Sequence, residues 1–90
     1  ITAERSVRIR NRLGLHARAA ARFVQTSTRF RARITASRNG RTMDGKSILG
    51  MLLLAASVGT TLELRAEGDD AEAALAALAT LVESGLGEEA

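Results

Sequence analysis

A short run near the start of the chain, Gly14-Leu15-His16-Ala17-Arg18, combines residue types that can hold a phosphoryl group. His16 is the only histidine, and it stands where a helix beginning at Ala17 would have its N-cap. The free N–H groups of a helix start bind anions, and the positive end of the helix dipole favours a neutral imidazole with a nucleophilic nitrogen. Gly14 permits close backbone approach, and the long Arg18 side chain can reach the same anion. This pattern predicts phosphoryl chemistry at His16. The backbone N–H groups of Ala17 and Arg18 would donate hydrogen bonds to the phosphoryl group.

A second run, GRTMDGKS at residues 40–47, matches the G-x-x-x-x-G-K-[ST] pattern of a nucleotide-binding P-loop. A P-loop follows a parallel strand that is apolar on both faces, whereas the segment before this run carries Arg31 and Arg33 on one face. No later apolar run ends in an Asp that could hold magnesium. Because Asn39-Gly40 also reads as a hairpin turn, we interpret the match as a coincidence of spacing.

Alternating and helical spacings predict the element order βαββαβα. Strands are expected near 3–10, 30–36, 41–44 and 60–67, and helices near 17–29, 48–56 and from Asp69 onward. Ser47 is a good N-cap for the second helix, and Asp69 with Glu72 resembles a capping box. The expected apolar stripe of the first helix consists of Ala17, Ala20, Ala21, Val24 and Ser27. These elements predict an α+β fold with one sheet and helices on one face.

Length and composition limit the function classes. Ninety residues form a single domain, 1–90, with one core. The chain has no cysteine and one histidine, which argues against disulfides, a metal site or a metal cofactor. No apolar run reaches the roughly 18 residues of a membrane helix, and no signal peptide opens the chain. We therefore expect a cytoplasmic protein that does not insert into membranes.

The charges are unevenly distributed. Residues 1–46 carry twelve of the thirteen basic residues and two acids, while residues 47–90 carry one basic residue and eight acids. A basic half is typical of proteins with an acidic partner, so a small nucleic-acid-binding domain is the alternative function. However, the predicted strands carry no series of aromatic residues on which bases could stack. Binding that weakens steeply as the salt concentration rises would be the signature of this alternative.

The strings GLHARAAARFV and MDGKSILGMLLLAAS, followed by a strand and a helix, resemble HPr, the histidine-containing phosphocarrier family of the bacterial phosphoenolpyruvate-dependent sugar phosphotransferase system. The resemblance covers about residues 4–88. It implies an open-faced β-sandwich in which three helices lie on one side of a four-stranded antiparallel sheet. It also implies a monomeric carrier, without independent small-molecule turnover, that takes a phosphoryl group from Enzyme I and passes it to an EIIA-type protein.

The resemblance assigns roles to individual residues. His16 matches the histidine phosphorylated on Nδ1, and Arg18 matches the arginine that neutralises the phosphoryl group. Ser47 matches a regulatory serine that an ATP-dependent kinase phosphorylates in many bacteria, with a phosphorylase as its counterpart. The apolar docking surface corresponds to Ile48, Leu49, Leu52 and Ala56.

One position departs from the family pattern. The family usually has proline directly after the arginine, where its fixed φ favours the first helical turn, but this chain has Ala19 and no proline. Alanine is a strong helix former, so the helix is still expected, with a looser start. The sequence leaves open whether the chain serves sugar uptake or a related branch in nitrogen regulation.

Overall fold

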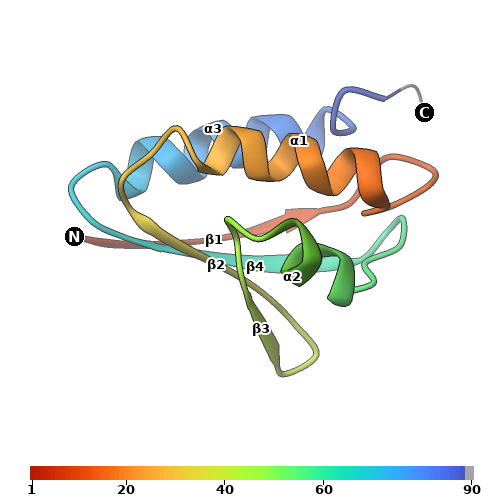
Figure 1. Ribbon diagram of the computed structural model, residues 1–90, viewed down its shortest axis with the longest axis horizontal. Helices are drawn as coiled ribbons and strands as arrows, with labels where there is room; N and C mark the ends of the chain where they lie inside the picture. The colour runs from red at the N-terminus through yellow and green to blue at the C-terminus, as the bar shows by residue number, and fades with distance from the viewer. Residues whose placement is uncertain (89–90) are drawn as a thin grey trace.

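Four antiparallel strands form one layer of the protein, and three helices pack against the apolar face of this sheet (Figure 1). The computed structural model describes residues 1–88. The strands are β1 (Thr2–Arg8), β2 (Arg33–Arg38), β3 (Arg41–Asp44) and β4 (Thr61–Glu67). The helices are α1 (Ala17–Ser27), α2 (Ile48–Leu53) and α3 (Ala71–Glu83). This architecture confirms the predicted βαββαβα order and the open-faced sandwich.

The sheet has the strand order β1-β4-β2-β3, so β4 lies in the middle and pairs antiparallel with both β1 and β2. In β4, Leu62, Leu64 and Ala66 point into the core, while the residues between them are exposed. This is the period-two pattern of a strand with one solvent face. The opposite face of the sheet is polar, and no helix of residues 1–88 covers it.

The hairpin between β2 and β3 turns at Asn39-Gly40, as predicted. Both residues have positive φ, 51° and 77°, which is the backbone that a two-residue hairpin turn requires. Arg38 and Arg41 flank the turn and pair with each other across it. Their guanidinium groups donate to the carbonyl oxygens of Leu54 and Leu53, at 2.9 and 2.8 Å. The hairpin thereby satisfies carbonyls at the end of α2.

Several predicted boundaries and faces were wrong. The first helix ends at Ser27, the second strand begins at Arg33, and α2 ends at Leu53 instead of Ala56. Ala55 has a φ of 51°, which terminates the helix. On α1, Phe23 is fully buried and Ala17 is exposed. The Phe23 ring faces the core, although this residue was not part of the expected apolar stripe. The buried residues of the helix are Ala19, Ala20, Phe23, Val24 and Ser27.

The predicted capping box at the start of α3 is also wrong. The helix begins at Ala71, its N-cap is Asp70 instead of Asp69, and no side chain caps it. Instead, the Asp70 carboxylate accepts hydrogen bonds from the backbone N–H groups of Arg31 and Ala32, both at 2.8 Å. Asp70 therefore fixes the loop before β2 to the start of α3. No helix among residues 1–88 is long and apolar enough to cross a membrane.

Replacing Asp70 with Ala should lower the thermal midpoint at neutral pH by several degrees. The hydrogen bond from the Arg31 amide, followed by that from Ala32, lowers the pKa of Asp70, although desolvation acts in the opposite direction. A carboxyl whose pKa is lowered by folding stabilises the protein above its unfolded pKa, and this stabilisation disappears as the pH falls through the folded pKa. The difference in thermal midpoint between wild type and Asp70→Ala should thus shrink when the pH falls below the ordinary pKa of aspartate. Thermal melts across pH check this, with exposed Asp69→Ala as the control; a difference independent of pH would contradict it.

Candidate functional site

His16 is the N-cap of α1, as predicted. Its backbone is extended, with φ −77° and ψ −177°, and its Nδ1 accepts a hydrogen bond from the backbone N–H of Arg18 at 3.3 Å. The carbonyl oxygen of His16 accepts from Ala20 N–H at 2.8 Å, which closes the first helical turn. The side chain is 28% exposed. Nδ1 therefore lies at the helix start beside N–H groups that can receive an anion.

The loop before His16 is held against the segment that follows α2. Leu15 N–H donates to the Ala56 carbonyl oxygen at 2.9 Å. Gly14 has a φ of +68°, and a Cβ at this position would lie 2.6 Å from the same oxygen. Only glycine fits both the backbone conformation and the space. This close approach brings the histidine loop next to the end of α2.

Glu88, which was not among the predicted site residues, reaches His16 from the C-terminal turn. Its Oε2 lies 2.6 Å from Nε2 of His16, and its Oε1 accepts from the Asn11 side-chain amide at 2.8 Å. The hydrogen bond from Asn11 lowers the pKa of Glu88 most; desolvation opposes this, and the hydrogen bond from His16 adds to it. A separation of 72 residues left no local signal for this contact. The only available clue was the turn sequence Gly85-Leu86-Gly87.

Three arginines line a pocket that Glu88 also lines. A pocket of about 290 Å³ is lined by Arg12, Arg18 and Arg22 together with Leu13, Gly87 and Glu88. Arg22 donates to the Leu86 carbonyl oxygen at 2.9 Å, and its guanidinium lies 4.0 Å from the Glu88 carboxylate. Arg18 was predicted to lie here, but Arg12 and Arg22 were not. The cluster can bind an anion, because guanidinium groups pair with phosphate.

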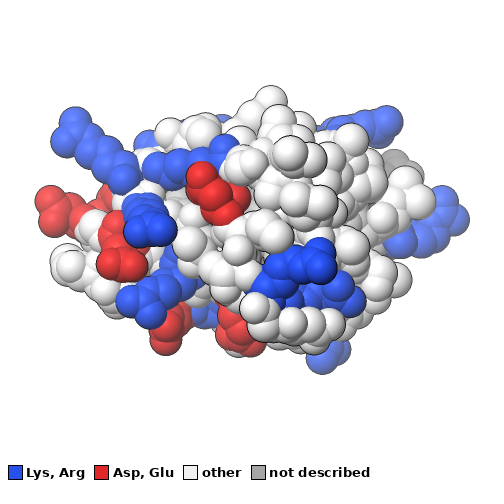
Figure 2. Space-filling view, turned by 60° about the horizontal axis from the view of Figure 1, so that its bottom comes forward, with Lys and Arg blue, Asp and Glu red and all other residues white. Residues whose placement is uncertain are grey.

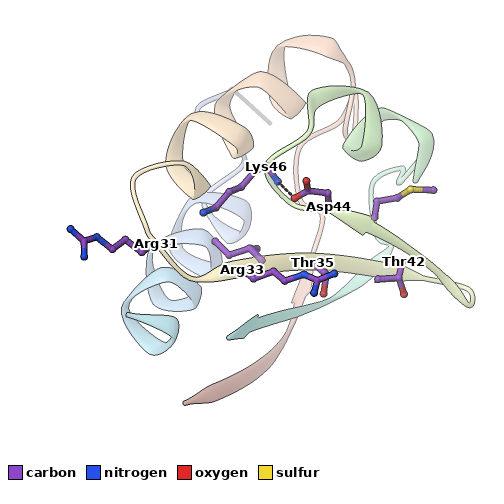
Figure 3. A pocket seen from close by; sticks show the side chains of 8 residues that line it. Arg31, Arg33, Thr35, Thr42, Asp44 and Lys46 are labelled. Atoms are coloured by element: carbon purple, nitrogen blue, oxygen red, sulfur yellow. Dashed lines mark hydrogen bonds between the residues drawn. The ribbon is translucent and has the colours of Figure 1, made fainter. Parts of the chain in front are cut away.

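The P-loop pattern at residues 40–47 does not form a phosphate cradle. Residues 41–44 of the pattern form β3, which is an edge strand of an antiparallel sheet. The ammonium group of Lys46 donates to the Phe30 carbonyl oxygen at 2.7 Å, and Ser47 caps α2 by accepting from Gly50 N–H at 2.9 Å. A pocket of about 460 Å³ beside Lys46 and Arg33 is open and shares no lining residue with the pocket beside His16 (Figure 3).

Apolar side chains are exposed on and around α2. Ile48 is 45% and Leu49 65% exposed, while Leu52 is half-buried. The proposed docking surface needs correction at Ala56, which is only 3% exposed: its side chain belongs to the core, and its carbonyl oxygen holds the histidine loop. Three further apolar residues are exposed and were not predicted. We group these three with Ile48 and Leu49 as the apolar rim, which consists of Leu13, Ile48, Leu49, Leu53 and Val58.

The nucleic-acid alternative gains no support. In Figure 2, acidic and basic side chains are mixed on the left part of the face, whereas a wide uncharged area with only basic side chains around it occupies the right part. On the polar face of the sheet, Arg65 lies 3.5 Å from Glu4 and 3.6 Å from Glu67, so acids offset its charge. Phe23 is buried and Phe30 half-buried, which leaves no stacking platform on the four strands of the described chain.

The fold and the site define a small open-faced β-sandwich that presents one histidine at a helix start. The family described as "PTS HPr component phosphorylation site" matches residues 3–84. Phosphocarrier protein HPr of Xylella fastidiosa is 44% identical over 86 residues, covering 96% of this chain and 97% of that protein. A crystal structure of HPr-C-His from Thermoanaerobacter tengcongensis has a TM-score of 0.93 at 44% identity, covering 98% of this chain and 99% of that one. The chain belongs to the HPr family of phosphotransferase-system phosphocarriers.

The relatives include more than one kind of carrier. Phosphocarrier protein NPr of Shewanella violacea is 42% identical over 81 residues, covering 90% of this chain and 89% of that protein. The identities of 44% and 42% do not favour one kind of carrier over the other.

Proposed function

We propose that Nδ1 of His16 accepts a phosphoryl group from phosphorylated Enzyme I and passes it to an EIIA-type acceptor. The observation that carries this proposal is the placement of His16 as the N-cap of α1, with Nδ1 next to the Arg18 N–H. A phosphoryl group on Nδ1 would take over that hydrogen bond and receive others from the helix start. Membership of the HPr family supports a phosphotransferase role in general.

The surroundings of His16 fit a phosphoryl group that is received from one protein and then passed to another. The backbone N–H groups of Ala17 and Arg18 lie in the first turn, where no helix carbonyl accepts from them, and Arg18 lines the adjoining pocket. The site is open at the surface, so the same nitrogen can be presented to a donor protein and then to an acceptor. The apolar rim beside it fits the role of a docking surface, since exposed apolar patches mark protein interfaces.

The direct test is phosphoryl transfer with purified proteins. The chain is incubated with Enzyme I and labelled phosphoenolpyruvate, and an EIIA-type protein is then added. We expect one acid-labile phosphoryl group per chain, followed by its appearance on the acceptor. Parallel assays with EIIA proteins of the sugar and nitrogen branches identify the partner. Absence of Enzyme I-dependent label would refute the proposal.

Replacing Arg18 with Ala should slow phosphoryl transfer without unfolding the protein. The guanidinium lies at an exposed position, and charge-assisted bonds to phosphate are roughly twice as strong as neutral ones, so we expect a loss of about tenfold, equivalent to about 1.4 kcal/mol. Arg18→Lys should recover part of the rate, because lysine supplies the charge without the bidentate geometry. Single-turnover rates measure this effect, and Arg29→Ala, an exposed arginine just beyond the far end of α1, is the matched control. Equal rates for wild type and Arg18→Ala would show that the backbone donors suffice.

We also propose that Ser47 is a regulatory phosphorylation site where the host has a suitable kinase and phosphorylase. Its Oγ already accepts from Gly50 N–H, and Ser47 directly precedes Ile48 and Leu49 of the apolar rim. A phosphate there would place charge at the edge of the docking surface.

A further inference from the structure

We propose that Glu88 is a positioning residue that holds the His16 ring through Nε2–H and thereby presents Nδ1 for phosphoryl transfer. The proposal rests on the proposed function, which it deepens by assigning a role to the C-terminal turn. The motivating observation is the 2.6 Å contact between the Glu88 carboxylate and Nε2.

The two contacts of the ring require the same tautomer. Nδ1 accepts from the Arg18 N–H, so this nitrogen carries a lone pair. The neutral imidazole then has its proton on Nε2, which donates to the carboxylate oxygen of Glu88. A carboxylate that accepts from one ring nitrogen fixes the orientation of the ring and the nitrogen that carries the proton. The nitrogen that remains available for phosphoryl transfer is Nδ1, which lies at the start of α1.

The carboxylate is itself held in place. The Asn11 side-chain amide donates to Glu88 at 2.8 Å and to the Gly14 carbonyl oxygen at 2.7 Å, and Asn11 is 1% exposed. Arg22 holds the turn by donating to Leu86. The Glu88 side chain is only 11% exposed. One buried amide therefore ties the C-terminal turn to the histidine loop.

The groups that face the carboxylate all favour its charged form. His16 and Asn11 contact it, Arg22 lies 4.0 Å away, and Arg18 adds a favourable charge interaction. These contacts keep the pKa of Glu88 below its ordinary value, so the carboxylate stays ionised throughout the neutral range.

The transfer step balances without moving a proton. The Nδ1 lone pair forms a bond to phosphorus while the bond from phosphorus to the donor atom of Enzyme I breaks, and that electron pair leaves with the donor atom. Because Nε2 keeps its proton, the phosphorylated ring carries positive charge, which the Glu88 carboxylate stabilises. The reverse sequence on the acceptor restores the neutral ring.

The first test observes the ring directly. Because His16 is the only histidine, a ¹H–¹⁵N spectrum of its imidazole, recorded about two pH units above the ordinary histidine pKa, gives a single set of signals. Wild type should show a proton on Nε2, shifted downfield and protected from exchange by the short hydrogen bond. This signal should be lost in Glu88→Ala and retained in Glu83→Ala, which removes an exposed acid from α3. A protected Nε2 proton in Glu88→Ala, or its absence in wild type, would overturn the proposal.

The second test measures function. Transfer from Enzyme I should fall about tenfold in Glu88→Ala, the lower range for loss of a group that orients a histidine. Glu88→Gln, which keeps an acceptor but lacks the charge, should fall less, and Glu83→Ala should match wild type. Equal rates for all variants would refute the positioning role. If wild type accepts no phosphoryl group, the proposed function fails, while the spectrum still decides whether Glu88 holds the ring.

Discussion

Replacing His16 with Ala should abolish phosphoenolpyruvate-dependent phosphorylation of the chain while leaving its fold intact. His16 is the only histidine, so no other side chain can offer a neutral imidazole nitrogen at the free N–H groups of a helix start. The variant loses the cap contact with Arg18 and the contact with Glu88. Loss of an N-cap costs about 0.5–2 kcal/mol, which a folded domain of this size tolerates.

The matched control for this variant is Ser47→Ala, which removes the N-cap of α2 and leaves His16 in place. Both variants should melt cooperatively with a modestly lowered midpoint, and only Ser47→Ala should accept the label. Undiminished labelling of a folded His16→Ala would show that the acceptor is another residue. A circular dichroism spectrum that matches wild type separates a lost acceptor from a lost fold.

Placing a negative charge at Ser47 should weaken docking to Enzyme I and leave the chemistry at His16 unchanged. Ile48 and Leu49 follow directly on the exposed side of α2, so a partner that covers the apolar rim must desolvate the new charge. Leaving a buried polar group unpaired costs about 1–3 kcal/mol, which corresponds to roughly a 5- to 150-fold increase in the carrier concentration for half-maximal transfer. We expect this increase for phosphorylated Ser47 and part of it for Ser47→Asp.

Measuring the thermal stability of the Ser47 variants distinguishes weaker binding to Enzyme I from a destabilised fold. An aspartate at position 47 can still accept from Gly50 N–H, and the positive end of a helix favours a negative charge. The thermal midpoint of Ser47→Asp should therefore not fall, and Ser47→Ala should keep wild-type docking. If Ser47→Asp docks as well as wild type but melts early, the serine is only a helix cap.

The sequence predicted features that depend on neighbouring residues. The helix start at His16, the hairpin at Asn39-Gly40 and the cap at Ser47 each depend on a few consecutive side chains and on local backbone preferences. Two separated motifs also indicated the family, because their types and spacing agree over most of the chain. The element order followed from hydrophobic periodicity.

The features that the sequence did not predict depend on contacts between distant segments. Glu88 and Asn11 are 77 residues apart in the chain and meet only in the folded structure. A capping box was expected at Asp69 and Glu72, but the N-cap is Asp70, whose carboxylate accepts from two backbone N–H groups of the loop before β2. Ala56 followed an apolar run and was assigned to the surface, although the tight approach of Gly14 places it in the core. Periodicity carries no information about such tertiary contacts.

The most direct test of the central claim is the position of the phosphoryl group on the phosphorylated chain. The ¹⁵N-labelled protein is phosphorylated with Enzyme I and phosphoenolpyruvate, and one-bond coupling between ³¹P and ¹⁵N identifies the bonded nitrogen. The arrangement of His16 at the start of α1 predicts a single phosphoryl group on Nδ1, with Nε2 still carrying its proton. A phosphoryl group on Nε2, or on any residue other than His16, would contradict it.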